Sequence, residues 1–521
     1  MPHGRQFVDY EPVTPSRRAS LRKSEDTAAL EDWPSHEDAA AQEGWTGSFE
    51  SARVPPPARP ADAAARPAKK RGWLLKRGHA ISYLGMFLFT AVLYFRPYEL
   101  LTALSAFSSI AFVLAIFTLT VFFPSQLMLE GNLTARPREV NLVLLLCLTG
   151  LLSIPFALDR YEAWATFSDT FIRAILMFIV MVNVVRTGWR LRGMIFLALA
   201  VSCVLSLAAL GNYWTGNLTV EGYRAAVQIG GMFGNPNDMA LHLATILPLV
   251  AALFFIRRGL VGKLFYAACA LLMVAGIAVT YSRSGFLALM SGALVMAWKI
   301  GKRNRLAVVM VILLFTASFF AFTPGGYANR VASIFSHSRD MVGSADARQA
   351  LLKRSLLVAA RHPLLGIGMG NFHRVSFREQ VSHNAYTQVA AEMGATALVL
   401  YVLFIITPLK KLKQIEKENY ETRRSRNVRF YYYLSVGMQA SLVAYLVSSF
   451  FASVAYQWYI YYLVGYAVCL RRMYDASRPE AELEKAGAAG VREHRAVYGM
   501  KHGLRVHARS EPEAAQEIRG A

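Results

Sequence analysis

The chain has 521 residues, of which 55% are hydrophobic and 17% charged, and it carries a formal net charge of +22. In a soluble protein this charge would indicate nucleic-acid binding, but several apolar runs reach the roughly 20 residues that cross a bilayer. Much of the positive charge lies in short loops and tails on one side of these runs. It is therefore a signal of membrane topology, and no nucleic-acid partner is expected.

In chain order, a polar segment comes first. Residues 1–79 are rich in Ala, Pro, Arg, Glu and Ser without apolar periodicity, which predicts a disordered tail. A polytopic membrane domain follows over 80–470, and a second polar tail covers 471–521. We expect an all-α integral membrane protein with about twelve transmembrane helices. The predicted spans are 80–96, 101–123, 140–158, 171–185, 193–213, 237–256, 264–281, 284–298, 306–323, 384–408, 430–451 and 454–470.

The distribution of Lys and Arg predicts the orientation of these spans. If the N-terminus is cytoplasmic, the positively charged short loops all fall inside, as the positive-inside rule expects. They hold Lys76 and Arg77; Arg136 and Arg138; Arg186, Arg190 and Arg192; Arg257, Arg258 and Lys263; Lys299, Lys302, Arg303 and Arg305; the run from Lys410 to Arg429; and Arg471 with Arg472. Both tails are therefore predicted to be cytoplasmic. The long basic loop 324–383 falls outside, because long loops cross largely regardless of charge.

Short helices are expected inside this outer loop. Residues 345–361 predict a helix with Ser344 as its N-cap, and His362-Pro363 ends it because proline disfavours helix in the preceding residue. The apolar positions that recur at helical spacing are Leu352, Leu356 and Ala360. The glycine-rich segment 366–372 is interpreted as a flexible turn.

Arginines mark two candidate sites on the outer side of the spans. Arg224 is an isolated cation in a short outer loop, and a solvated loop charge is the alternative reading of it. Asn237, further along, is interpreted as the N-cap of the next span. Arg283 lies in Tyr281-Ser282-Arg283-Ser284-Gly285, a tight reversal between two spans. Its guanidinium could extend to lipid headgroups, or bind phosphate oxygens in a bidentate geometry that lysine lacks.

A histidine lies at the mouth of the span that follows the outer loop. His383 has a reference pKa near neutrality, which suits a general base. The alternative is a structural histidine beside Asn384, which can cap the helix. Glu392, nine residues on, faces about 180° away around a helix and is assigned to a polar network. Four loop arginines precede the histidine: Arg348, Arg354, Arg361 and Arg374.

Other chemistries lack their sequence signatures. The sequence contains no metal constellation of His and carboxylates, no P-loop, no dinucleotide fingerprint and no serine nucleophile elbow. Its four cysteines all lie in apolar runs. Any reaction is therefore expected to use arginine cations and a histidine base, without a metal or cofactor.

Four motifs, taken in order, resemble the O-antigen ligase and O-antigen polymerase superfamily over residues 80–470. They are Gly234-Asn235-Pro236-Asn237-Asp238, Ser282-Arg283-Ser284-Gly285, His362-Pro363-Leu364-Leu365-Gly366-Ile367-Gly368, and His383-Asn384-Ala385-Tyr386 with Ala391-Glu392-Met393-Gly394. The resemblance implies a multi-pass glycosyltransferase of the bacterial inner membrane. Its donor would be a glycan on undecaprenyl pyrophosphate, and its acceptor the lipid A-core or another surface acceptor at the periplasmic face.

The resemblance also implies roles for individual residues. Arg283 and His383 match the family's arginine and histidine, and Arg224 is similar in placement to a pyrophosphate-binding arginine. Arg224 and Arg283 would bind the pyrophosphate, while His383 would take or orient the proton of the acceptor hydroxyl. Attack on the sugar would be direct and inverting. The residues expected to support this site are Arg348, Arg354 and Asn384.

Two alternatives stay open. A polymerase of O-antigen or exopolysaccharide repeats would use the same kind of donor and a second lipid-linked repeat as acceptor. The compact outer loop favours the ligase. A transporter or channel would carry ionisable groups near the middle of its spans, whereas Arg224, Arg283 and His383 all lie at their outer edge.

Overall fold

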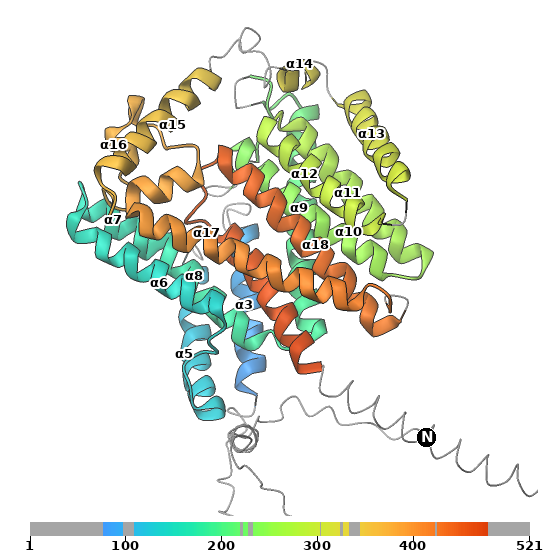
Figure 1. The fold of residues 1–521 in the computed structure, drawn as a ribbon, viewed down its shortest axis with the longest axis horizontal. Coiled ribbons are helices and arrows are strands. Elements are labelled where there is room, and N and C mark those ends of the chain that lie inside the picture. The colour runs from blue at the N-terminus through green and yellow to red at the C-terminus, as the bar shows by residue number, and fades with distance from the viewer. Residues whose placement is uncertain are drawn as a thin grey trace, which may run out of the picture.

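The computed structural model describes residues 77–96, 109–218, 222–227, 233–302, 304–323, 327–332, 344–422 and 425–477. These residues form a bundle of helices, and none of them belongs to a β-strand (Figure 1). Residues 1–76 and 478–521, which hold most of the two predicted tails, lie outside the described residues. So do residues 101–108 of the second predicted span.

The described residues contain the following helices in chain order. They are α3 (Gly78–Phe95), α5 (Ile110–Glu130), α6 (Arg138–Ser153), α7 (Arg160–Thr166), α8 (Ile172–Val184), α9 (Gly188–Trp214), α10 (Pro236–Ile256), α11 (Leu260–Val279), α12 (Arg283–Ile300), α13 (Arg305–Phe322), α14 (Tyr327–Ala332), α15 (Ser344–Arg361), α16 (Phe372–Val375), α17 (Ala385–Asn419) and α18 (Arg426–Ser448). A last helix covers residues 458–477.

The predicted all-helical membrane fold is confirmed in its class. Among the described residues, nine helical segments are long and apolar enough to cross a bilayer. The count of twelve stays a prediction, and its three other spans correspond to α12, α13 and the last helix. The span predicted at 171–185 was wrong in its start. A π turn over Phe167–Phe171 joins α7 to α8, so this apolar segment begins at Arg160.

Ion pairs group the inner loops in the way that the charge distribution predicts. Glu416 of α17 lies 2.5 Å from Lys299 Nζ and 2.7 Å from Lys302 Nζ. Glu139, at the start of α6, is fully buried and pairs with Arg471 at 2.7 Å. All five residues come from segments predicted to share one side of the membrane. Those segments do meet, while the side that faces the cytoplasm stays a prediction.

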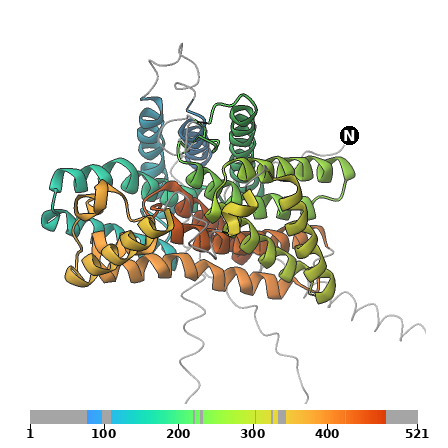
Figure 2. The same cartoon turned by 90° about the horizontal axis from the view of Figure 1, so that it is seen from above.

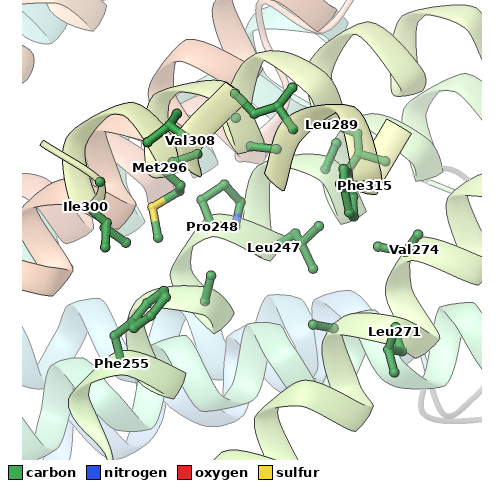
Figure 3. Close-up of a pocket in the computed structure, with 18 of the residues that line it drawn as sticks. Leu247, Pro248, Phe255, Leu271, Val274, Leu289, Met296, Ile300, Val308 and Phe315 are labelled. Atoms are coloured by element: carbon green, nitrogen blue, oxygen red, sulfur yellow. The ribbon is translucent and has the colours of Figure 1, made fainter. Parts of the chain in front are cut away.

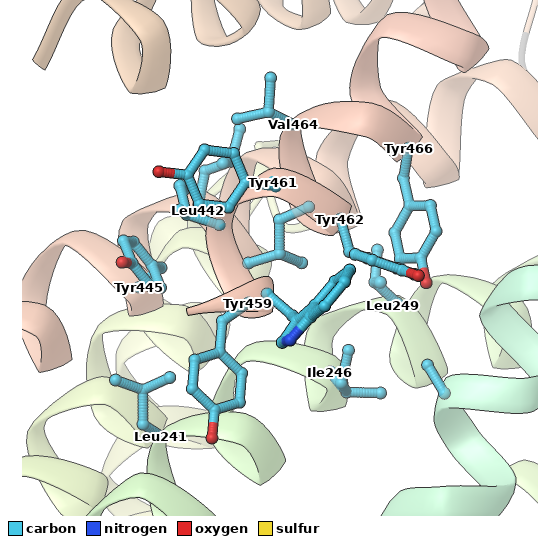
Figure 4. Packing of buried hydrophobic residues seen from close by; sticks show 14 of the residues in the cluster. Leu241, Ile246, Leu249, Leu442, Tyr445, Tyr459, Tyr461, Tyr462, Val464 and Tyr466 are labelled. Carbon is cyan, nitrogen blue, oxygen red and sulfur yellow. The ribbon is translucent and has the colours of Figure 1, made fainter. Parts of the chain in front are cut away.

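The last helix forms the centre of the bundle (Figure 2). Its residues 458–470 are all buried, as expected of a helix that is apolar on every face. Figure 4 shows its tyrosines packed among aliphatic side chains of α10 and α18. Their hydroxyls keep partners, since Tyr462 bonds Thr90 at 2.8 Å and Tyr461 donates to the Ala455 carbonyl at 3.0 Å. This core fixes the loop 452–457 that leads into the helix.

Helix α17 is interrupted near its start and is longer than predicted. Gly394 has φ 87° and ψ 175°, which separates a short helix over 385–393 from the long remainder. The long part continues to Asn419, so residues 410–419 are helical and not part of an inner loop.

The predicted flexible turn at 366–372 is instead pinned to this interruption. The backbone N–H of Ile367 donates to the Ala391 carbonyl at 3.0 Å, and that of Gly368 to the Glu392 carbonyl at 2.9 Å. Ala395 N–H donates to the Pro363 carbonyl at 2.7 Å. These bonds satisfy the backbone groups that the break in the helix releases, which is why the loop is held in place.

Helix α15 confirms the helix predicted at 345–361, but its buried face is a different one. Leu351, Ser355 and Val358 are buried, whereas Leu356 of the predicted stripe is 53% exposed. The buried face was not predicted because Ser355, which lies in it, is polar and interrupts the apolar spacing. Its hydroxyl is satisfied locally by the Leu352 carbonyl at 2.9 Å, which allows it to lie in the apolar face.

Candidate functional site

Arg224 lies in a hydrogen-bonded cluster at the start of α10 and α12. Its side chain is only 4% exposed. Nε donates to the Thr280 carbonyl at 2.9 Å, and Nη2 donates to Asn237 Oδ1 at 2.7 Å. Ala225 N–H donates to the Val279 carbonyl at 3.1 Å, which attaches this loop to the end of α11. Arg224 is therefore a buried, oriented cation and not a solvated loop charge.

Asn237 connects Arg224 to the neighbouring turn. Its Oδ1 also accepts a hydrogen bond from Ser282 Oγ at 2.9 Å. The interpretation of Asn237 as the helix N-cap was wrong. Asn235 is the cap and accepts from the Asn237 backbone N–H at 2.9 Å. Because Pro236 takes the first helical position, the cap falls one residue before it, which releases the Asn237 side chain for Arg224.

Residues 281–284, here called the Ser-Arg turn, are held from several directions. Ser282 caps α12 by accepting from Gly285 N–H at 3.1 Å, and its carbonyl accepts from the Tyr327 hydroxyl at 3.1 Å. Tyr281 has φ 52°, a left-handed conformation that is strained for a bulky residue. Strain of this kind persists only where the surroundings fix the backbone, and here α10 and α14 supply the contacts.

Arg283 is the first residue of α12 and is partly exposed. At this end of a helix the aligned peptide dipoles add positive potential. Through Asn237 and Ser282, the buried Arg224 is linked directly to the same turn. Arg224 and Arg283 thus both belong to a turn at a helix N-terminus, an arrangement that suits a phosphate or pyrophosphate anion.

His383 also has a left-handed backbone, with φ 50°. Its N–H donates to Ser453 Oγ at 2.8 Å. The next residue, Asn384, caps α17 by accepting from Tyr386 N–H at 2.9 Å and from Thr387 N–H at 3.1 Å. The capping role considered for Asn384 is therefore confirmed. The cap and the serine together set the direction in which the imidazole leaves the backbone.

The surroundings of His383 keep its imidazole neutral. Burial, and after it the guanidinium of Arg348 on α15, lower the pKa of His383 to about 4. At neutral pH the ring is therefore uncharged and has a nitrogen lone pair that can accept a proton or a hydrogen bond. An anion bound beside Arg348 would offset that positive charge and raise the pKa again, which would make the ring a stronger base.

The predicted loop arginines take different places. Arg348 is the one that the structure brings to His383. Arg354 Nε donates to the Val375 carbonyl at 2.8 Å and ties α15 to α16. Arg374 Nε pairs with Glu162 Oε2 at 2.9 Å. Arg354 thus joins two helices of the outer loop, and Arg374 ties this loop to α7.

The Ser-Arg turn and His383 lie at one end of the bundle. Tyr327 of α14 contacts the turn and Arg348 of α15 faces His383, and both helices lie at the top of Figure 1. A second link runs through the last helix. Ser453 contacts His383, and six residues later the ring of Tyr459 packs on Phe233, just before the Asn235 cap, at 6.4 Å.

An apolar groove lies further along the same helices. Figure 3 shows the cavity, of about 580 Å³, between α10, α11, α12 and α13. Its lining on α12 begins at Leu289, six residues after Arg283 and therefore about 9 Å along the helix axis, and continues to Ile300 at the end of the helix. Small residues on α12, including Gly292, Ala293 and Ala297, create the space. The groove is shaped for a hydrocarbon chain.

The polar groups of this end suit anions better than metal cations. Among the described residues, no three His, Cys, Asp or Glu side chains come together as a metal site would require. The groups whose hydrogen bonds are described above are guanidinium, amide and hydroxyl groups, and one imidazole lies near them. The roles of Asn237 and Ser282 were not predicted from the sequence, although the position of Ser282 next to Arg283 in its motif was a signal.

The comparison with known families agrees with the motif resemblance. Residues 268–402 match the family model described as O-antigen ligase. The match contains the Ser-Arg turn, α15 and His383, whereas Arg224 and Asn237 precede it. No curated protein matches the chain significantly.

Proposed function

Because residues 268–402 belong to the O-antigen ligase superfamily, we propose that the protein is a membrane glycosyltransferase. It transfers a glycan from undecaprenyl pyrophosphate to a hydroxyl of the lipid A-core, or of another surface acceptor, at the periplasmic face. The observation that carries this proposal is that two features lie at one end of the bundle. A buried arginine is linked to the Ser-Arg turn, and a neutral histidine lies beside a second helix start.

Arg224 and Arg283 bind the pyrophosphate of the donor in this proposal. The acceptor oxygen forms a bond to the anomeric carbon while the bond from that carbon to the phosphate oxygen breaks. The electron pair leaves with undecaprenyl pyrophosphate, and the configuration at the sugar inverts. The two guanidinium groups and the N-terminus of α12 stabilise the charge that develops on the departing phosphate. The guanidinium of Arg224 is already oriented by Asn237, which Ser282 also bonds, so this group needs little reorganisation.

His383 accepts the proton of the attacking hydroxyl. Its low pKa makes it a weak base in the empty site, and the donor's negative charge beside Arg348 raises its basicity when substrate is bound. The proton therefore moves most readily when donor and acceptor are both present. Arg348 supports this proton transfer. Arg354 holds the backbone at Val375, before the histidine, and Asn384 caps the helix that follows the histidine.

The groove between α10 and α13 holds the polyprenyl chain of the donor. It starts about 9 Å from Arg283 along the axis of α12 and continues toward the inner end of that helix. A phosphate at the Ser-Arg turn would thus carry its hydrocarbon chain directly into apolar surroundings. The proposed acceptor is lipid A-core or a similar surface hydroxyl, and the polymerase alternative would use a second lipid-linked repeat instead.

The test is transfer by the purified protein from a lipid-linked glycan, in the presence of EDTA, together with a surface-glycan gel from a strain that lacks the protein. We expect release of undecaprenyl pyrophosphate and glycan on the lipid A-core with wild type only. His383→Ala and Arg283→Ala should abolish transfer without loss of membrane insertion. His362→Ala and Arg361→Ala, at exposed positions of the same outer loop, are the matched controls and should stay active.

The gel separates the alternatives. Core that carries single repeats in the deletion strain would indicate a polymerase, and an unchanged pattern would indicate another acceptor or a transporter. Full transfer by His383→Ala would overturn the proposed role of the histidine. Loss of transfer on adding EDTA would overturn its independence of metal ions.

A further inference from the structure

Glu392 is a buried acid that the proposed chemistry leaves without a role. It lies on the short helix 385–393, nine residues after His383, and is 2% exposed. Oε2 accepts from the Tyr456 hydroxyl at 2.8 Å, and Oε1 accepts from the Phe372 N–H at 3.2 Å. Among the described residues it forms no ion pair. A buried carboxyl group without a cation is costly, so its retention calls for a specific task.

The partner of Glu392 belongs to the same loop that holds His383. Tyr456 comes three residues after Ser453, whose hydroxyl accepts from His383 N–H at 2.8 Å. The loop 452–457 thus contacts the short helix at both of its ends, about 13 Å apart by helix rise. One contact alone would let the helix pivot about it, whereas two contacts fix both its position and its angle.

The loop is itself fixed to the core. The Val454 carbonyl accepts from the Tyr445 hydroxyl at 3.4 Å, and the Ala455 carbonyl accepts from the Tyr461 hydroxyl at 3.0 Å. The far end of the short helix is equally confined. A Cβ on Gly366 would lie 2.3 Å from the Glu392 carbonyl carbon, so the outer-loop backbone packs directly on this turn.

We propose that Glu392 and Tyr456 are positioning residues: their hydrogen bond, called here the Glu392–Tyr456 clamp, holds His383 in its left-handed conformation. This inference rests on the proposed function and adds to it the device that aims the base. Among the described residues, the charged group that faces the imidazole is Arg348 from α15, and loop 452–457 contributes only the Ser453 hydroxyl. Loss of the hydrogen bond between Glu392 and Tyr456 would let the short helix 385–393 tilt. The imidazole of His383 would then move into water, where Arg348 affects it less.

The experiment compares Tyr456→Phe, Glu392→Ala and Glu392→Gln. Because a small displacement of a catalytic group lowers turnover steeply, we expect Tyr456→Phe and Glu392→Ala to lower kcat roughly 10- to 100-fold. The KM for the donor should stay unchanged, since the Arg224 cluster is not touched. Glu392→Gln keeps an oxygen that accepts from Phe372 N–H and an amide that can bond Tyr456, so it should retain most of the activity. Tyr462→Phe is the matched control, because it removes one buried hydroxyl bond, to Thr90.

A readout independent of turnover is the titration of His383, followed by mass spectrometry of its carbethoxylation against pH. In wild type the midpoint should lie near pH 4, and in Tyr456→Phe it should move toward the ordinary value of 6.5. Unchanged kcat and unchanged midpoint in Tyr456→Phe, with wild type active, would overturn the clamp and leave the proposed function standing. Equal losses in Tyr462→Phe would also overturn it. If wild type transfers nothing, the proposed function fails, while the titration still decides whether the clamp sets the position of His383.

Discussion

Arg224 donates a hydrogen bond of 2.7 Å from Nη2 to Oδ1 of Asn237. The same oxygen accepts from Ser282, so one amide joins the loop before α10 to the start of α12. The relationship orients a buried cation relative to Arg283, which neither of their local sequences could do alone. Substitution of Asn237 should therefore weaken binding of the donor substrate.

Asn237→Ala should raise the KM for the lipid-linked donor about tenfold, the equivalent of about 1.4 kcal/mol. The reason is that Arg224 loses a charge-assisted partner of the kind that contributes about 1.5–3 kcal/mol. Steady-state kinetics with purified protein measures this. Asn235→Ala is the matched control, since it removes only the helix cap and should cost about 1 kcal/mol of stability without a change in KM. Equal KM values in the two variants would contradict the assignment.

The pH dependence of kcat/KM should reflect the lowered pKa of His383. Because burial and Arg348 lower that pKa to about 4, the rate should be constant near neutrality and fall as the pH drops through about 4. The free energy of unfolding should likewise fall as the pH drops. The unfolded histidine binds protons below about 6.5, so acid favours the unfolded state increasingly between these two values.

Arg348→Ala should move the acid limb of that profile upward, because it removes one of the two causes of the low pKa. The shift should stop short of the ordinary value, since burial, the larger cause, remains. An acid limb that stays in place would show that Arg348 does not act on His383.

Gly394→Ala should destabilise the protein by roughly 2–5 kcal/mol, through a left-handed backbone and an overpacked contact. The residue has φ 87°, and a Cβ there would lie 2.3 Å from the Leu364 carbonyl oxygen. Thermal unfolding in detergent measures the effect. Gly211→Ala on α9 is the control, because nothing lies within 4 Å of its Cβ position. This helical site should gain about 0.5–1 kcal/mol, so the two substitutions should differ in sign.

Ala293→Phe should fill part of the apolar groove and raise the KM for donors with a long polyprenyl chain about tenfold or more, a loss of about 1.4 kcal/mol or more. Donors with a short prenyl chain, which do not reach the filled part, should be affected less. Leu294→Phe is the matched control, since this neighbour on α12 is 49% exposed and does not line the groove. If the two variants changed the KM to the same extent, for donors with long and with short prenyl chains alike, the groove would not hold the chain.

Two parts of the fold could be predicted from the sequence because they depend on local chemistry. Apolar runs of span length predicted the helices, since hydrocarbon surroundings require internally bonded backbone. The helix at 345–361, its end at Pro363 and the cap at Asn384 followed from side chains that act on their own neighbours. The motifs around Arg283 and His383 also predicted the superfamily, which the match over 268–402 confirms.

The remaining features depend on contacts between distant segments. The Asn237 side chain could cap a helix or bind Arg224, and only the packing of α10 against the Ser-Arg turn decided between them. The loop 366–368 is held by hydrogen bonds to the break in α17 at Gly394. No local sequence pattern predicted that break. The clamp from Glu392 to Tyr456 joins residues 64 positions apart. Local sequence patterns were thus enough to predict most of the helical segments and the residues that are candidates for the site, but not every helix end. Which of these candidates are oriented, and by which partners, depends on tertiary packing, because hydrogen bonds between helices form only after those helices pack.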